Sequence, residues 1–227
     1  MSILAVIPAR GGSKGVPRKN VHLLAGRPLI AHTIEHAKRS SLVTRVVVST
    51  EDQEIASVSR SLGAEIVRRP PELAGDTASS ESALAHVLDE LQRSEKYEPE
   101  LVVFLQCTSP IRAADDVDRA VQHLRAEGAD SLLSACRSHA FVWRRQGNDV
   151  KPVNYDPLQR LPRQQLPVEF IENGSLYVFK PWVLRKLGCR LGGKISLFEM
   201  DYWSSFQIDS PEDLQLCEWI LQHRGGR

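Results

Sequence analysis

Short runs of apolar, often β-branched residues alternate with amphipathic stretches along the first two thirds of the chain. The short runs are apolar on both faces, as in parallel strands covered by helices, whereas the longer stretches carry apolar residues at helical spacing. The predicted strands are residues 3–7, 45–49, 65–67, 101–105 and 131–135, and the predicted helices are residues 28–40, 52–61, 79–93 and 114–126. Strands that alternate with helices in this way predict right-handed βαβ crossovers and a doubly wound, mostly parallel α/β sheet.

This alternation breaks between residues 137 and 167, where arginine, tryptophan and proline are mixed without a period. A long irregular insertion in a compact domain is usually a functional segment, a partner surface or disordered. The α/β pattern then returns with strands at 175–179, 196–200 and 205–208 and a helix at 181–187. A last helix is predicted to begin after Ser210, a suitable N-cap, with Pro211 in its first position. We therefore predict one domain over residues 1–227 with an inserted segment at about 137–172.

Composition and charge exclude several classes of protein. The chain has 227 residues, of which 42% are hydrophobic, and its 29 basic and 28 acidic side chains give a net charge of +1. A general nucleic-acid binder would carry a basic excess, and no apolar run approaches the roughly 18–20 residues that span a membrane. The N-terminus lacks the basic lead-in of a signal peptide, and the four cysteines have no metal-binding or redox spacing. We expect a cytoplasmic protein with reduced thiols that binds neither nucleic acid nor membranes.

A glycine-rich basic loop follows the first predicted strand, with the sequence PARGGSKGVPRKN over residues 8–20. Its three glycines let the backbone approach a ligand, and Arg10, Lys14, Arg18 and Lys19 contribute four cations. Ligands of open α/β sheets bind beyond the carboxyl ends of the strands, where this loop lies. The loop matches neither the Walker A nor the dinucleotide-binding pattern. It predicts a polyphosphate site, and the alternative is a solvated basic turn.

Residues 69–80 form a second candidate segment, which is stiffened by prolines. Asp76 or Ser79 could serve only to cap the helix that follows, in which case the segment has a structural role. Arg69 and Ser80 are the residues best suited to contact a base and a ribose hydroxyl.

Two further polar residues follow predicted strands. The amide of Gln106 could bind a sugar or a base, although the Ser109-Pro110 pair behind it is also typical of a plain turn. Asp209 is a natural Mg²⁺ ligand beside a phosphate loop, and the alternative is an ordinary residue at the start of a helix.

Two motifs point to other functions. His32, Glu35 and His36 match the H-x-x-E-H pattern of some zinc peptidases, but their helix lies away from the strand ends that host α/β sites. The glycosylation sequon at Asn173 has no meaning in a chain outside the secretory pathway. The zinc peptidase is kept as a minor alternative.

Six segments in order resemble the acylneuraminate cytidylyltransferases, the CMP-sialic acid synthetases. They are residues 7–15, 17–20, 69–80, 106–110, 162–167 and 173–177. The resemblance implies a Rossmann-like nucleotidyltransferase fold and a homodimer that uses CTP and Mg²⁺ in nucleotide-sugar biosynthesis. In the implied reaction, the anomeric hydroxyl of a nonulosonic acid attacks the α-phosphorus of CTP and releases pyrophosphate, which requires mainly alignment and charge neutralisation.

The same resemblance implies a role for each matching residue. Arg10, Lys19 and Asp209 would be catalytic, with Asp209 holding Mg²⁺. The triphosphate would be held by Arg10, Gly11, Gly12, Ser13, Lys14, Lys19 and Asn20, and the cytidine by Arg69, Ala78 and Ser80. The sugar would be bound by Gln106, Arg163, Gln164, Asn173 and Gly174. The insertion would be a dimerisation arm that carries Arg163 to the partner's site, where its guanidinium could grip the sugar carboxylate bidentately.

The chain departs from the family at two points. Gln207 stands where the sialate enzymes commonly carry a second aspartate, and the family's lysine near His139 is replaced, with Arg144 or Arg145 as substitutes. These departures leave legionaminic, pseudaminic and eight-carbon keto-deoxy acids open as substrates. Gln207 also leaves open a CTP-binding homologue that has lost catalysis.

Overall fold

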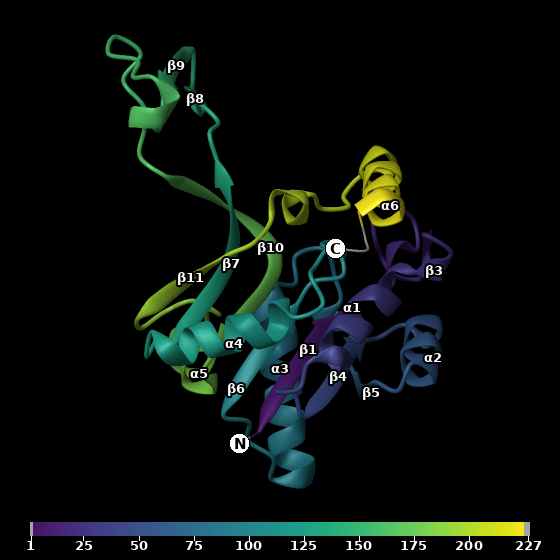
Figure 1. The fold of residues 1–227 in the computed structure, drawn as a ribbon. Coiled ribbons are helices and arrows are strands. Elements are labelled where there is room, and N and C mark those ends of the chain that lie inside the picture. The colour runs from purple at the N-terminus through teal and green to yellow at the C-terminus, as the bar shows by residue number, and fades with distance from the viewer. Residues whose placement is uncertain (1, 225–227) are drawn as a thin grey trace.

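The computed structural model describes residues 2–224 and contains a central seven-stranded sheet (Figure 1). In spatial order its strands are β11 (Ile195–Glu199), β7 (Ser131–Ser138), β10 (Glu169–Phe179), β6 (Leu101–Leu105), β1 (Ile3–Pro8), β4 (Arg45–Thr50) and β5 (Glu65–Arg68). All neighbouring strands are parallel except β10, which runs antiparallel to both β6 and β7. The predicted mostly parallel α/β sheet is therefore confirmed.

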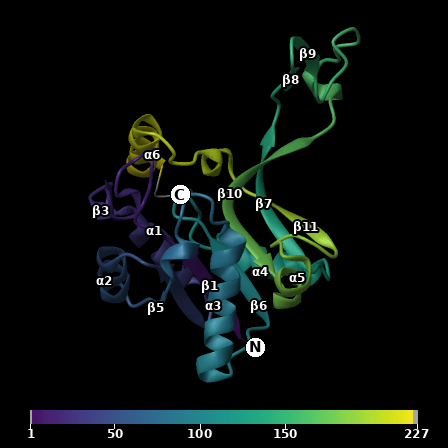
Figure 2. The ribbon, with the colours of Figure 1, turned by 180° about the vertical axis from the view of Figure 1, so that it is seen from behind.

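Helices cover both faces of the sheet, because successive residues of the central strands β1 and β6 point to opposite sides and all are apolar. Ile3, Ala5 and Ile7 pack with α1 (Leu29–Arg39), α2 (Gln53–Ser61), α4 (Asp116–Ala126) and α6 (Pro211–Arg224). Leu4 and Val6 pack with α3 (Ser80–Glu95) and α5 (Pro181–Leu187) on the other face, which Figure 2 shows from behind. The predicted crossovers therefore build a three-layer body. None of the helices in residues 2–224 is long and apolar enough to cross a membrane.

The remaining elements are short. They are β2 (Leu23–Leu24) and β3 (Arg27–Pro28), which pair with each other, and the 3-10 turns η1 (Lys19–Val21), η2 (Pro71–Leu73) and η4 (Tyr202–Ser205). The prediction of a strand at 205–208 is wrong, because this stretch begins in η4 and continues without regular secondary structure outside the sheet. One hydrogen bond, from the N–H of Ile208 to the carbonyl of Thr108 (2.8 Å), fixes the segment beside the end of β6.

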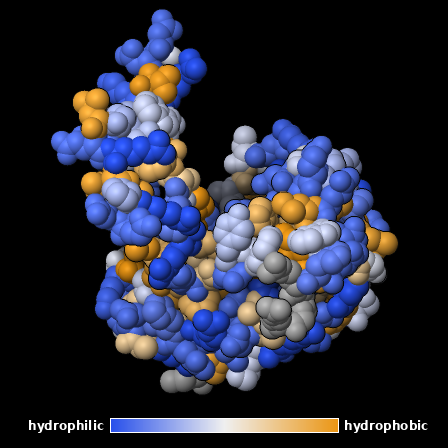
Figure 3. Space-filling view, turned by 45° about the horizontal axis from the view of Figure 1, so that its top comes forward, coloured by the Kyte–Doolittle hydropathy of each residue, from blue (hydrophilic) through white to orange (hydrophobic). Residues whose placement is uncertain are grey.

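Residues 139–168 project from the body as an arm (Figure 1). The arm contains the hairpin of β8 (Trp143–Gln146) and β9 (Asp149–Pro152) and the turn η3 (Arg163–Gln165), so the expectation of an irregular segment is only partly right. Figure 3 shows hydrophobic residues scattered among the polar ones on its surface. Its exposed apolar side chains include Val142, Trp143, Val150, Val153, Leu158, Leu161 and Val168.

Candidate active site

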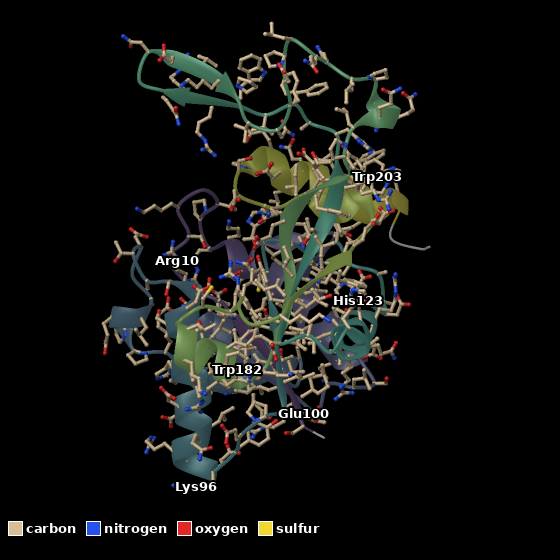
Figure 4. The ribbon with its side chains drawn as sticks, turned by 90° about the vertical axis from the view of Figure 1, so that its left-hand side faces the viewer. Arg10, Lys96, Glu100, His123, Trp182 and Trp203 are labelled. Carbon is tan, nitrogen blue, oxygen red and sulfur yellow. The ribbon has the colours of Figure 1, made fainter. Side chains whose placement is uncertain are left out.

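A cleft of about 420 Å³ opens beyond the carboxyl ends of β1 and β6. Ten of the residues predicted from the sequence line it: Arg10, Ser13, Lys14, Lys19, Asn20, Arg69, Ala78, Ser80, Gln106 and Asp209. Figure 4 shows Arg10 on the side of the sheet where α3 runs down to Lys96, opposite His123 of α4. Segments that are far apart in the sequence therefore meet in one place, as the strand-end rule for open α/β sheets predicts.

Carboxylates that follow β4 hold the phosphate loop in shape. Arg18 has a left-handed backbone (φ 55°), and its guanidinium donates to the carboxylates of Asp52 and Glu54. The hydrogen bonds from Arg18 lower the pKa of Asp52 to about 2. The N–H of Gly11 donates to Glu51 Oε1 (2.7 Å). In this structure Arg18 and this N–H thus bond to carboxylates of the protein.

Gly11 and Gly12 differ from the other predicted residues of the loop because neither lines the cleft. Asn20 lines the cleft and also supports the loop, since its side-chain amide donates to the carbonyl of Arg10 (2.9 Å). The loop is therefore preorganised by its own contacts, and its cleft surface is made mainly of side chains.

Arg10 and Lys14 converge on the carboxylate of Asp76. Lys14 Nζ lies 2.7 Å and Arg10 Nη1 3.3 Å from the carboxylate oxygens of Asp76, and Arg10 Nη1 also donates to the carbonyl of Gly75 (3.0 Å). The hydrogen bond from Lys14 lowers the pKa of Asp76. Asp76 does not cap α3, because that cap is the hydroxyl of Ser79. Two loop cations that lie on one anionic group are suited to a phosphate in its place.

Lys19 joins the phosphate loop to the segment that contains Asp209. Its Nζ donates to the carbonyl of Ile208 (2.6 Å) and to Asp209 Oδ1 (3.1 Å). The Lys19 side chain is only 11% exposed, whereas that of Asp209 is 75% exposed. A cation and a carboxylate therefore stand side by side at the edge of the cleft, and the carboxylate keeps room for another ligand.

The residues present fit a magnesium site of the substrate-assisted kind. Mg²⁺ is usually held by one or two carboxylates together with waters and substrate phosphates, and Asp209 faces the cleft of the cationic loop. Within residues 2–224 no group of three or more His, Cys, Asp or Glu side chains is placed to hold a metal ion without a substrate.

Helix α1, which carries the H-x-x-E-H motif, gives no support to the zinc-peptidase alternative. His32 Nε2 lies 2.9 Å from the carbonyl of Leu24, and the carboxylate of Glu35 pairs with Arg27. Burial lowers the pKa of His36 to about 3. His32 and Glu35 thus serve separate contacts, and the carboxylate that should assist a zinc-bound water is engaged by arginine.

Arg69 also lines the cleft and is buried against β4. Its Nη2 donates to the carbonyl of Ser49 (2.6 Å) and its Nε to the hydroxyl of the same residue (3.2 Å). Ala78 and Ser80 line the cleft beside it. Arg69, Ala78 and Ser80 thus form a wall of the cleft in which the planar guanidinium of Arg69 is held in place by Ser49. Such a wall is suited to a base and a ribose.

Gln106 lines the cleft, and Gly174 lies directly behind it, buried and not itself among the cleft-lining residues. Gly174 lies in the bulge of β10 with a left-handed backbone (φ 61°), and a Cβ added there would be 3.0 Å from the side-chain oxygens of both Gln106 and Gln207. A side chain at position 174 would therefore displace the two amides. Glycine lets them approach the strand closely.

Three predicted sugar residues lie elsewhere. The side chain of Asn173 is completely buried and does not line the cleft; it donates to the carbonyl of Ser204 (3.1 Å) and accepts from the hydroxyl of Ser134 (2.6 Å). Arg163 and Gln164 lie in η3 of the arm and are not among the residues that line the cleft. Any contact between these two and a sugar must therefore come from a second copy of the chain.

Comparison with known proteins places this fold and cleft in a family. The sequence profile described as "Cytidylyltransferase" matches residues 4–220, which is nearly the whole chain. The chain belongs to the cytidylyltransferase family. The resemblance found in the sequence is confirmed at this level.

Curated relatives of this chain include enzymes named for different sugars. It is 37% identical to N-acylneuraminate cytidylyltransferase A of Danio rerio over 95% of this chain and 50% of that protein. It is 38% identical to CMP-N,N'-diacetyllegionaminic acid synthase of Legionella pneumophila over 98% of this chain and 97% of that one. The chain thus spans about half the length of the vertebrate relative and nearly all of the bacterial one.

A solved structure supports the fold of this chain. CMP:2-keto-3-deoxy-manno-octonic acid synthetase, solved in complex with CTP, superposes with a TM-score of 0.73 at 19% identity over 98% of this chain and 99% of the other. At this identity the likeness concerns the arrangement of strands and helices.

Proposed function

We propose that the chain transfers CMP from CTP to the anomeric hydroxyl of a sialic-acid-type nonulosonic acid and releases pyrophosphate. One observation carries the proposal: a single cleft gathers the cationic loop, the carboxylate of Asp209, the wall at Arg69 and the amide of Gln106. The names of the curated relatives support CTP and a nine-carbon keto acid as substrates.

In this proposal the triphosphate lies along the phosphate loop. Arg10 and Lys14 exchange Asp76 for phosphate oxygens, and Lys19 neutralises charge that develops as pyrophosphate leaves. Mg²⁺, when bound by Asp209 and the phosphates, supplies further charge neutralisation at the phosphorus. Gln106 and the backbone at Gly174 orient the sugar so that its anomeric oxygen lies in line with the α-phosphorus.

Pyrophosphate release tests the proposal directly. The purified protein is incubated with CTP, Mg²⁺ and one of a panel of acids: N-acetylneuraminic, legionaminic, pseudaminic or an eight-carbon keto-deoxy acid. We expect release with at least one nine-carbon acid and formation of its CMP ester. Release with the eight-carbon acid alone would change the substrate class. If CTP binds but no pyrophosphate is released with any of the acids, the result would favour a CTP-binding homologue that has lost catalysis, the alternative suggested by Gln207.

The proposed magnesium site leads to a prediction about Gln207. Gln207 stands two residues before Asp209, and its side-chain oxygen lies next to Gly174. Gln207→Asp should therefore add a second anionic ligand and lower the Mg²⁺ concentration for half-maximal rate by about tenfold. Magnesium titration of the rate measures this, with Asp209→Asn as a control that should move the requirement upward. An unchanged requirement in Gln207→Asp would place residue 207 outside the metal's reach.

The contacts of Asp76 lead to a prediction about CTP affinity. If its carboxylate occupies cations that the triphosphate needs, Asp76→Asn removes a competitor and lowers the KM for CTP. The expected change is up to about fivefold and smaller at high salt, since exposed ion pairs contribute about 0.2–1 kcal/mol. Steady-state kinetics at two salt concentrations measure it. The control is Asp115→Asn, which removes an exposed carboxylate near Arg119 outside the cleft. A raised KM in Asp76→Asn would mean that Asp76 itself assists binding.

We further propose a homodimer in which the arm of one protomer reaches the cleft of its partner. The exposed apolar side chains of the arm and the position of Arg163 outside its own cleft support this arrangement. We also propose that the enzyme works in the cytoplasm, which agrees with Cys107, Cys136, Cys189 and Cys217 all being free thiols. Sedimentation analysis tests the dimer, and a monomeric active enzyme would overturn it.

The dimer proposal predicts a selective effect of Arg163. Arg163→Ala should raise the KM for the sugar acid by about tenfold or more and leave the KM for CTP within about twofold, because a bidentate contact to a carboxylate is lost. Arg160→Ala is the matched control, since Arg160 lies in the same arm but stacks on Phe141. A larger effect on CTP than on the sugar would contradict the assigned role.

A further inference from the structure

Arg112 lies behind the sugar end of the cleft, in the loop between β6 and α4. Its side chain is buried (8% exposed) and bonds to three separate parts of the fold. Nη2 donates to the carbonyls of Gln106 (2.8 Å) and Ser175 (2.7 Å), and Nη1 donates to the hydroxyl of Thr33 (3.3 Å). One guanidinium therefore ties the end of β6 to the bulge of β10 and to helix α1.

The hydrogen-bond partners of Arg112 are neutral. Its hydrogen bonds to the described residues go to carbonyl and hydroxyl oxygens, and its Nε is buried without a partner among them. Burial lowers the pKa of Arg112 to about 10, so the group keeps its charge at neutral pH. The carboxylate that acts on it through space, Asp116, is bonded to the N–H of Ala113 (2.7 Å). A buried cation without a bonded anion is costly, and joining two carbonyls does not by itself require a charge.

The two carbonyls that Arg112 binds belong to the segments that shape the sugar end. The N–H of Gln106 donates to the same Ser175 carbonyl (3.3 Å), so this oxygen joins β6 to β10 as well. Ser175 directly follows Gly174, against which the amide of Gln106 lies. A shift of either carbonyl would therefore move the amide relative to the bulge.

We propose that Arg112 is a positioning residue for the sugar acid. Its guanidinium fixes Gln106 and Gly174 relative to each other, and its charge, one peptide group behind Gln106, favours an anionic substrate at that end of the cleft. CTP binds at the other end, where Arg112 makes no contact. This inference rests on the proposed function.

Kinetics of Arg112→Met and Arg112→Lys test the inference. Methionine keeps the length of the side chain but removes its donors and charge, and we expect the KM for the sugar to rise by about tenfold or more with the KM for CTP within about twofold. Lysine keeps the charge but cannot span two carbonyls with a planar fork, so a rise of about threefold is expected. Arg119→Met, which removes a half-exposed arginine of α4, should change neither KM.

Each outcome decides between a structural and a positioning role. Far-UV circular dichroism and thermal unfolding first establish which variants fold. Equal rises in both KM values, or an unchanged KM for the sugar, in a folded variant overturn the proposal. If Arg112→Met does not fold, Arg112→Lys decides by the same criterion. If the wild-type protein is active and the KM for the sugar is unchanged in Arg112→Lys, only the proposed role of Arg112 is overturned. If the wild-type protein releases no pyrophosphate with any of the sugars, the proposed function and this inference are overturned together.

Discussion

Lys19→Ala should lower the kcat of pyrophosphate release by about 10²–10³-fold, because it removes a preorganised donor from the place where charge develops. Lys19 is largely buried, and its ammonium touches the carbonyl of Ile208 and the carboxylate of Asp209. A cation shielded from water interacts with phosphate oxygens more strongly than an exposed one. The proposed role lies in the transition state, so kcat should fall by more than the affinity for CTP.

Lys38→Ala is the matched control for this experiment. Lys38 also donates to a backbone carbonyl, that of Leu62 (2.8 Å), but it lies on α1 and is not among the residues of the cleft. Its loss should leave kcat and both KM values unchanged within about twofold. A Lys19→Ala variant that folds and keeps the wild-type kcat would remove Lys19 from the mechanism. A variant with a raised KM for CTP and an unchanged kcat would limit Lys19 to ground-state binding.

The parallel part of the fold could be predicted because its sequence signal is local. In β1, Ile3, Ala5 and Ile7 serve one face of the sheet while Leu4 and Val6 serve the other, which yields a short run with no polar position. Such runs, separated by amphipathic helices, permit few arrangements apart from βαβ crossovers. The carboxyl ends of β1 and β6 then fall on one edge, which is why the loop at Arg10 and Gln106 could be expected to meet.

The arm could not be predicted in the same way because its strands face solvent. All four residues of β8 are exposed, so no alternation of buried and exposed side chains marks it. In β10 the first four residues pair only with β7, and the bulge between Glu172 and Tyr177 interrupts the pattern, so the sequence indicates only the buried half from residue 175 onward. When a strand forms because it pairs with a neighbouring strand and not because its side chains are buried, its own sequence carries little signal of it.

The side-chain partners at the site were also beyond local sequence reasoning. Each candidate cation could serve a ligand or another part of the protein, and only the fold shows that Arg18 faces Asp52 while Lys19 faces Asp209. From the sequence Asn173 was expected to bind the sugar, yet its buried side chain bonds to groups of three other segments of the protein. The pair Glu51-Asp52 offered one usable signal, since it follows β4, the strand that pairs with β1, and therefore had to lie beside the phosphate loop.

Gly15→Ala should reduce kcat/KM by about 10²-fold, because the phosphate loop and the segment of Asp209 touch at this glycine. A Cβ added at Gly15 would lie 1.8 Å from the carbonyl oxygen of Asp209, and a backbone oxygen cannot turn aside as a flexible side chain can. The two segments must therefore separate by an ångström or more. Misplacement of about 1 Å at a reacting centre can cost about 10²-fold in rate.

Gly12→Ala is the control from the same loop, because nothing lies within 4 Å of a Cβ built at Gly12. It should leave the free energy of unfolding unchanged, whereas Gly15→Ala should also lower it by about 1–3 kcal/mol through overpacking. Urea unfolding and pyrophosphate release measure the two effects on each variant. Full activity in a stably folded Gly15→Ala would mean that the enzyme works with the loop and Asp209 apart. In that case neither the bond between Lys19 and Asp209 nor a metal held between Asp209 and the triphosphate could belong to the mechanism, since both require this approach.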